Sequence, residues 1–170
     1  MVQLRSGPAD AILELIGGPA RRLYLTDTVD HPSPPAPPSD PLTDFFWEGA
    51  REGRLLIQRC LACGTYIHFP RPICRACLST RLEPAEVSGA ATLYSFTETH
   101  RAFHPFFVSR VPYLVASVAL REQSDLRLLS NLVGIAEPDV RIGMHLQVDY
   151  EWLDEHLAIP VFRPAPLVAP

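Results

Sequence analysis

Two matched cysteine pairs constrain this chain more than any other feature. Their spacing is Cys60-x2-Cys63-x10-Cys74-x2-Cys77. Two C-x-x-C pairs on either side of a short hairpin bring four thiolates around one point, and zinc is bound by a tetrahedron of such ligands at about 2.3 Å. With all four positions filled by protein, such a site is structural and not catalytic. The spacing therefore predicts one structural zinc ion per chain, without which this small module does not fold.

Disulfides and a redox dithiol are the alternatives to a metal site. Disulfides need an oxidising compartment, which nothing in the sequence implies. A redox C-x-x-C pair does not need a second matched pair. Iron stays open as an alternative to zinc. Gly64 follows the first pair and permits a positive φ there, whereas Leu78 stands at the equivalent place after the second pair.

Arginines surround the predicted metal site. Four thiolates and one zinc ion leave an excess of negative charge, which we expect neighbouring arginines to offset. These are Arg59, Arg71, Arg75 and Arg81.

The length of 170 residues suits one domain with a small appendage. Six prolines between His31 and Pro41 exclude a helix and predict an extended linker, which is a tether or a strap along a partner. The predicted parts are an N-terminal extension at 1–39, a helix at 40–53, a zinc ribbon at 54–85, an OB-fold at 86–164 and a tail at 165–170.

A helix is predicted directly after the linker. Asp40 suits its N-cap and Pro41 its first position. One face carries residues at helical spacing, namely Leu42, Phe45, Phe46, Gly49 and Ala50. Three consecutive large aromatics, Phe45, Phe46 and Trp47, cannot all face one core from a short helix, so we expect a partner contact there. Packing on the chain's own domain is the alternative.

The remainder of the chain has a β pattern. Two strands are predicted around the first cysteine pair, at Arg54–Arg59 and Thr65–Phe69. Five more follow, at Ala91–Thr99, Tyr113–Leu120, Arg127–Val133, His145–Trp152 and Ile159–Phe162. The last contains a proline and is placed at a sheet edge. Five short strands in about 80 residues favour the five-stranded OB-fold barrel, so the fold class is mainly β.

Several runs of residues, taken in order, resemble one known family. They are Phe46–Leu55, Gln58–Gly64, Phe69–Cys74, Gly89–Thr97, Pro112–Ala116, Leu132–Gly134 and Arg141–Met144. Over about residues 42–164 the chain resembles bacterial and archaeal proteins that join a helix, a rubredoxin-like zinc ribbon and a C-terminal OB-fold. This family was once filed as a domain of unknown function and is associated with acyl-CoA metabolism.

The resemblance implies an accessory role. Such proteins are partners of thiolase-superfamily enzymes, including thiolases and the lipid-transfer-type aldolases of steroid side-chain breakdown, and some accompany hot-dog-fold hydratases. The OB-fold subunit then docks on the enzyme and completes or gates the acyl-CoA site. A two-plus-two heterotetramer follows, because thiolase-like enzymes are commonly dimers.

The residues themselves agree with a non-catalytic role. All four cysteines are committed to the metal site, so none is left as a thiolase-type nucleophile. The sequence has no G-x-S-x-G elbow, no H-E-x-x-H motif and no Gly-rich phosphate loop. The runner-up function is a single-stranded nucleic-acid-binding module, and the third is an independent acyl-CoA enzyme. A net charge of −4 and the absence of lysine argue against nucleic acid.

A polar loop after the first barrel strand is the candidate acyl-CoA-binding segment. His100 and His104 could exchange protons there, and ordinary hydrogen bonding is the simpler interpretation. For binding CoA phosphates, adenine or the acyl tail, the candidates are His100, Arg101, Phe106, Phe107 and Arg110. An acidic run, Asp149, Glu151, Asp154 and Glu155, is interpreted as a solvated face. We expect a cytoplasmic protein, because no secretion signal or membrane-spanning run is present.

Overall fold

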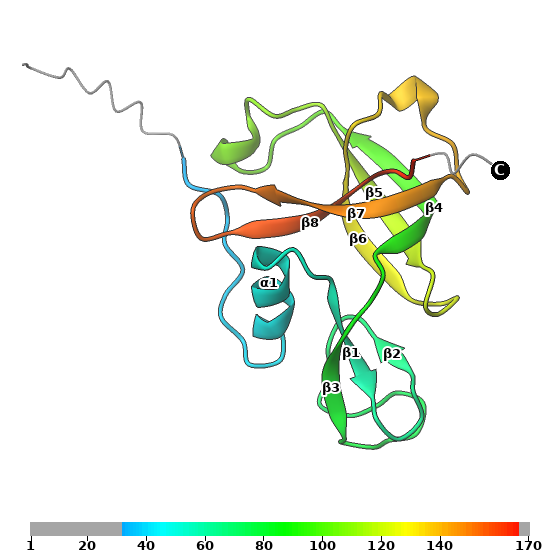
Figure 1. Cartoon of the computed structure of the whole chain (residues 1–170). Helices are drawn as coiled ribbons and strands as arrows, with labels where there is room; N and C mark the ends of the chain where they lie inside the picture. The colour runs from blue at the N-terminus through cyan, green and yellow to red at the C-terminus, as the bar shows by residue number, and fades with distance from the viewer. Residues whose placement is uncertain (1–31, 167–170) are drawn as a thin grey trace, which may run out of the picture. The chain divides into compact units, whose positions relative to one another are not determined.

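A three-stranded sheet and one helix form the first half of the folded chain (Figure 1). The structure, a computed structural model, describes residues 32–166; most of the predicted N-terminal extension lies outside the described residues. The elements here are α1 (Asp44–Arg51), β1 (Leu56–Cys60), β2 (Tyr66–Ile67) and β3 (Leu82–Glu86). The sheet is antiparallel, in the order β2-β1-β3. It is the zinc ribbon, and it includes β3, a strand that was not predicted from the sequence.

Helix α1 begins four residues later than predicted. The carboxylate of Asp40 accepts a hydrogen bond from the Leu42 N–H at 2.9 Å, and the Asp44 carboxylate accepts one from the Asp40 N–H at 2.9 Å. Residues 41–43 therefore form a turn, and Thr43 stands at the N-cap without a side-chain hydrogen bond. Asp40 therefore makes the cap-type hydrogen bond that was predicted, and its carbonyl accepts the Asp44 N–H at 2.9 Å, but it caps the turn that leads into α1. The prediction of Pro41 as the first helical residue was wrong, because the regular helix begins at Asp44.

Five strands close into a barrel, which confirms the predicted mainly β fold. They are β4 (Ala90–Thr99), β5 (Tyr113–Leu120), β6 (Arg127–Leu132), β7 (His145–Trp152) and β8 (Ala158–Pro164), in the order β4-β5-β6-β8-β7. Two short 3-10 turns, η1 (Pro105–Phe107) and η2 (Glu137–Asp139), lie in the connections. Strand β8 lies between β6 and β7, so the prediction of an edge position for it was wrong.

The helix, the base of the ribbon and the barrel share one hydrophobic core. Phe46 from α1 and Ile57 from β1 belong to the same buried cluster as Leu93 and Phe162 of the barrel. Phe162 is completely buried and Ile57 and Leu93 are each 1% exposed. No helix among residues 32–166 is both long and apolar enough to cross a membrane.

Polar contacts also join the ribbon to the β5–β6 loop. The side chain of Gln123 accepts a hydrogen bond from the Tyr66 N–H at 2.9 Å and donates one to the Tyr66 carbonyl at 3.1 Å. Arg75, between the second pair of cysteines, forms an ion pair with Asp125 at 2.6 Å. The amide of Gln123 thus completes the hydrogen bonding of an edge residue of the ribbon sheet, which fixes the ribbon against the barrel.

Candidate metal centre and barrel-mouth cleft

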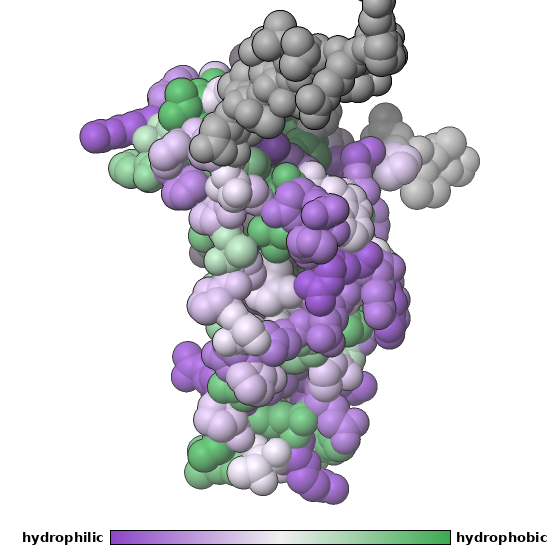
Figure 2. Space-filling model, turned by 90° about the vertical axis from the view of Figure 1, so that its left-hand side faces the viewer, coloured by the Kyte–Doolittle hydropathy of each residue, from purple (hydrophilic) through white to green (hydrophobic). Residues whose placement is uncertain are grey.

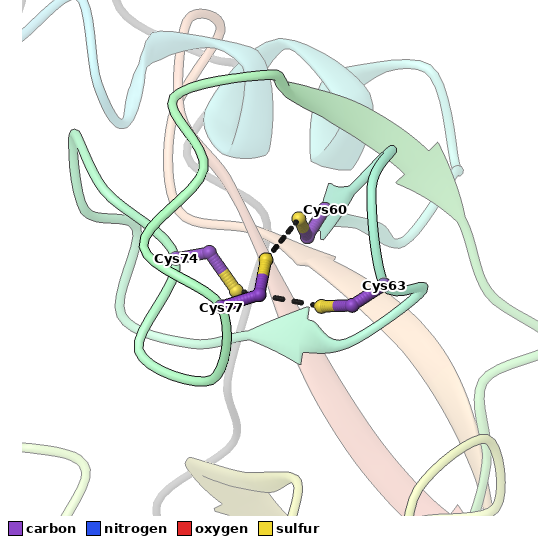
Figure 3. Close-up of side chains that lie close together, drawn as sticks. All are labelled: Cys60, Cys63, Cys74 and Cys77. Atoms are coloured by element: carbon purple, nitrogen blue, oxygen red, sulfur yellow. Dashed lines mark hydrogen bonds between the residues drawn. The ribbon is translucent and has the colours of Figure 1, made fainter.

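The four cysteines meet at one end of the ribbon sheet (Figure 3). Their sulfur atoms all lie within 4.8 Å of one another, and Figure 3 shows them converging on one point. Cys60 comes from the end of β1, while the other three lie in the loops around β2. Cys60 and Cys74 are buried, and Cys63 and Cys77 are exposed. The four ligands predicted from spacing are therefore in place around a common centre.

The geometry of the sulfurs fits a tetrahedral metal ion. Sulfur ligands at about 2.3 Å from a tetrahedral centre lie about 3.8 Å from one another. The Sγ atoms of Cys60 and Cys77 are 3.6 Å apart, and so are those of Cys63 and Cys74. These separations fit a zinc ion held by all four residues, with no ligand position left open.

Each cysteine pair forms a tight knuckle with the same backbone geometry. The N–H of Gly64 donates to the Cys60 carbonyl at 2.8 Å, and the N–H of Leu78 donates to the Cys74 carbonyl at 3.0 Å. Both residues adopt a positive φ, 78° at Gly64 and 60° at Leu78. Glycine adopts this conformation freely, whereas a bulky side chain does so at a cost in free energy.

The pKa values of two of the four thiols shift in opposite directions. Hydrogen bonds from the Thr65 side chain and backbone lower the pKa of Cys63 to about 6. The Ser79 N–H lowers the pKa of Cys77, but neighbouring thiols and burial outweigh it and raise that pKa to about 12. The Cys77 thiol therefore keeps its proton at a pH at which the Cys63 thiol loses its own. A divalent cation among them removes this conflict, because coordination deprotonates each thiol.

The arginines near the site do not all face the cysteines. The Arg59 Nε donates to the Gly64 carbonyl at 3.3 Å, and its guanidinium lies 5.3 Å from the centre of the Tyr66 ring. Arg75 is paired with Asp125, as described above. The guanidinium groups of Arg71 and Arg81 have no hydrogen-bonded or ionic partner within residues 32–166.

A cleft of about 950 Å³ opens at the mouth of the barrel, where β5 begins and β6 and β7 end. Its lining includes Phe107, Arg110 and Tyr113, together with Glu98 and Glu151. Arg110 forms an ion pair with Glu151 at 2.6 Å. The ring of Phe107 lies 5.8 Å from that of Tyr113. The cleft thus combines an aromatic wall with a fixed arginine and carboxylates.

The structure brings together only part of the predicted acyl-CoA-binding set. Phe107 and Arg110 line the cleft, and Phe106 supports them: its ring lies 4.4 Å from the Arg110 guanidinium and 5.1 Å from Phe107. His100 and Arg101 lie outside the lining. The Nε2 atom of His100 lies 2.6 Å from a carboxylate oxygen of Glu98, and the Arg101 guanidinium lies over the Phe103 ring at 5.6 Å.

The predicted partner aromatics of α1 mostly pack on their own chain. Phe46 is 8% exposed and is a core residue, so it is not available to a partner. Phe45 and Trp47 are partly buried against the same core. Trp47 meets Phe46 edge to face at 5.0 Å and lines a smaller cleft, of about 480 Å³, with Pro37 and Pro38. The alternative of packing on the chain's own domain therefore accounts for most of this surface.

The acidic run spans β7 and the turn after it, and most of its carboxylates make specific polar contacts. Glu151 pairs with Arg110, and Asp149 pairs with Arg163 across the β7–β8 ladder. The Asp154 carboxylate accepts the N–H groups of residues 156 and 157 at 2.7 and 2.8 Å in the following turn. Glu155 differs from these three: its carboxylate lies 3.3 Å from the His156 Nε2, and both side chains are 85% exposed.

Comparison with known proteins identifies the family of this chain. Residues 47–83 match the ChsH2 rubredoxin-like zinc ribbon domain, and residues 85–151 match the ChsH2 C-terminal OB-fold domain. A solved structure described as an Ltp2-ChsH2(DUF35) aldolase contains a chain that is 41% identical, with a TM-score of 0.69. The match covers 76% of this chain and 98% of that one. The chain belongs to the ChsH2 (DUF35) family.

Two curated relatives are longer proteins, and the chain spans less than half of the length of each. One is a probable enoyl-CoA hydratase alpha subunit from Thermomonospora curvata, 44% identical over 121 residues. The other is a 3-oxo-4,17-pregnadiene-20-carboxyl-CoA hydratase alpha subunit from Mycobacterium tuberculosis, 34% identical over 126 residues. The matches cover 71% and 74% of this chain but only 37% and 39% of the relatives.

A second solved structure shows the same fold at low identity. It is a DUF35-family protein of unknown function from Sulfolobus solfataricus, 17% identical with a TM-score of 0.51. The match covers 75% of this chain and 87% of that one.

Proposed function

We propose that this chain is a non-catalytic subunit of a thiolase-superfamily enzyme, a thiolase or a lipid-transfer-type aldolase, that acts on an acyl-CoA. The observation that carries the proposal is the 41% identity to nearly the whole of a ChsH2(DUF35) chain in an Ltp2-ChsH2 aldolase structure. Two relatives named as alpha subunits of CoA-ester hydratases add to it. The assembly is a heterotetramer of two plus two, and its place is the cytoplasm.

In this proposal the enzyme partner supplies the carbon–carbon chemistry. All four cysteines of the chain converge on the metal centre, which leaves no thiol to attack an acyl-CoA. A zinc ion there, one per chain, would be held by Cys60, Cys63, Cys74 and Cys77 and would order the ribbon loops. Because these sulfurs fill a tetrahedron, they leave no place for a substrate.

We further propose that the barrel-mouth cleft completes the acyl-CoA site of the assembled enzyme. Its aromatic wall suits the acyl portion of the thioester, since Phe107 and Tyr113 stand side by side there. Arg110 is held in place by Glu151 and Phe106. His100 and Arg101 lie outside the cleft lining, where the phosphates of CoA could reach them from solvent. The carboxylates in the lining suit neither those phosphates nor a nucleic-acid backbone.

Co-purification is the test of the subunit role. The tagged full chain is produced in its native host and isolated under native conditions, and the proteins that come with it are identified by mass spectrometry. We expect a thiolase-superfamily subunit in stoichiometric amount, with a mass by light scattering that fits two plus two. Isolation of the chain alone, or with nucleic acid instead of an enzyme, would refute the proposal.

A matched pair of arginines tests the cleft. Both Arg110 and Arg127 lie over an aromatic ring, at 4.4 Å from Phe106 and 4.3 Å from Tyr94, but only Arg110 lines the cleft. We expect Arg110→Ala to weaken acyl-CoA binding by the assembled complex about tenfold, and Arg127→Ala to leave it unchanged. If the two variant complexes bound acyl-CoA with equal affinity, the cleft would not be part of the acyl-CoA site.

A further inference from the structure

The knuckles around the metal centre expose large apolar side chains. Leu61, Ile73 and Leu78 are 52%, 47% and 77% exposed. Each is the immediate neighbour of a cysteine in a cluster whose sulfurs lie within 4.8 Å of one another. All three side chains are thus exposed on the two loops that hold the metal centre, and we name them the knuckle patch. Figure 2 shows hydrophobic residues exposed at the lower end of the molecule, where the ribbon lies.

Leu78 is the most informative member of the knuckle patch. It occupies the place that glycine occupies in the first knuckle, with a φ of 60° against 78° at Gly64. In this conformation a leucine is less stable than a glycine, because its Cβ crowds the backbone. Its side chain contributes little to the stability of the fold, because most of it is exposed. A large apolar side chain at a strained and exposed position is explained by contact with another molecule.

The charges beside the knuckle patch indicate what covers it. Arg71 lies two residues before Ile73, and its guanidinium has no partner within residues 32–166. The carbonyl of Arg81 accepts the Leu61 N–H at 2.9 Å, so this arginine also borders the patch, and its guanidinium is likewise unpaired in the described part of the chain. A complementary surface is apolar at its centre and carries carboxylates at its rim.

Two other occupants fit less well. A second copy of this chain, docked through the same patch about a two-fold axis, would bring arginines against arginines. A single-stranded nucleic acid would suit the arginines, but its bases stack on flat aromatic rings, and the patch is made of leucine and isoleucine.

We propose that the knuckle patch of Leu61, Ile73 and Leu78, flanked by Arg71 and Arg81, is the surface on which the thiolase-like subunit docks. The partner presents an apolar depression with Asp or Glu side chains around it. This inference rests on the subunit role proposed above and assigns that role a surface on the ribbon in place of the α1 aromatics. Leu78 is its anchor, because its side chain is the most exposed and has no function within the fold.

Replacement of Leu78 separates docking from folding. Leu78→Gly and Leu78→Asn both suit a positive φ, so the ribbon should keep its metal and its melting temperature should stay or rise. The zinc-loaded full-length variants are titrated against the purified enzyme subunit that the wild-type chain captures. We expect at least about a tenfold weaker affinity for both. Leu129→Ala, which truncates a leucine that is 66% exposed on β6, is the matched control and should bind like the wild type.

Each outcome has a distinct meaning. Unchanged affinity of both Leu78 variants would overturn the docking surface while leaving the subunit role intact. An equal loss in Leu129→Ala would overturn the assignment to the ribbon. Loss of retention on immobilised single-stranded DNA, with unchanged enzyme binding, would make the patch a nucleic-acid surface. If the wild-type chain binds no thiolase-like subunit, the subunit role fails and the docking surface fails with it.

The arginines provide a second test. Arg71→Glu combined with Arg81→Glu should weaken binding to the same enzyme subunit and reduce the dependence of the association rate on salt. Arg127→Glu on the barrel is the control. An affinity and salt dependence equal to those of the wild type would contradict the acidic rim assigned to the partner.

Discussion

His68 should make the stability of this protein fall as the solution becomes acidic. It follows β2, and its ring lies 4.4 Å from Phe69 and 5.5 Å from Phe46 of helix α1. Burial among these rings lowers the pKa of His68 from 6.5 to about 4, because the charged imidazolium loses its hydration there. No charged group contributes to that shift. His68 is therefore neutral in the folded protein at pH 7.

The sign of the effect follows from proton binding. The folded pKa is lower than the unfolded one, so between about pH 6.5 and 4 the unfolded chain binds a proton that the folded chain does not. Stability is complete above pH 6.5 and is lost as the pH falls through this window. The linkage relation gives a loss of about 2 kcal/mol at pH 5 and at most about 3 kcal/mol below pH 4.

His68→Phe is the variant that isolates this effect. It keeps an aromatic ring against Phe46 and cannot be protonated. Both proteins keep the four cysteines, so protonation of the thiols affects them alike. We expect the free energy of unfolding in urea to fall by about 2 kcal/mol more for the wild type than for the variant between pH 7.5 and 5. An NMR titration that gives His68 a pKa near 6.5, or parallel pH profiles for the two proteins, would refute the argument.

Three further predictions concern the fold. A strong chelator at pH 7 should unfold the ribbon, while the far-UV circular dichroism of the barrel persists. Limited proteolysis should then cut the chain between Cys60 and Cys77. An unchanged digest would contradict a structural metal. Phe46→Ala should lower the free energy of unfolding by about 3–5 kcal/mol, measured in urea, because its ring lies in the shared core. Gly89→Ala should lower the free energy of unfolding by at least about 1–3 kcal/mol, because Gly89 has a φ of +70° and a Cβ there would overlap Val148.

The barrel could be predicted because its strands carry their signal locally. Tyr113–Leu120 is mostly apolar and alternates only loosely, as expected of a well-buried strand, and β5 has those bounds, with every second residue buried. The same is true of the bounds of β7, His145–Trp152. The β7 sequence alternates apolar and polar residues, and the run of apolar residues in β5 is typical of a buried strand. The four metal ligands were equally visible, because their spacing alone defines the site.

The elements that were missed depend on their neighbours. Strand β3 is Leu82-Glu-Pro-Ala-Glu86, without an apolar alternation, and it forms because β1 pairs with it along five residues. The proline in β8 suggested a sheet edge, yet β8 is an interior strand of the barrel. Its parallel pairing with β6 covers only the residues opposite Asn131 and Leu132, beyond Pro160. A proline outside that short ladder removes no hydrogen bond from it, and its carbonyl accepts the Ser130 hydroxyl at 2.6 Å.

The aromatics of α1 show why surface assignments are harder than fold assignments. With a single core beneath the helix, three consecutive aromatics would leave at least one for a partner. In the structure the ribbon contributes His68 beside Phe46, and the proline-rich segment lies beside Trp47. Phe46 and Trp47 therefore have neighbours on two sides of the helix, and their burial needs no partner protein. No local pattern in residues 40–53 contains that information.

Leu78 is the opposite case, in which the sequence contained a signal whose meaning depended on the structure. The sequence shows that the second cysteine pair is followed by Leu78 and not by glycine. A knuckle without glycine can have one of two structures. The loop can adopt another conformation that suits leucine, or it can keep the glycine conformation at a cost in stability. The φ of 60° favours the second of these, and an exposure of 77% leaves the side chain little contact within the chain to offset that cost. A position that lowers stability without an internal contact is where a partner surface should be sought first.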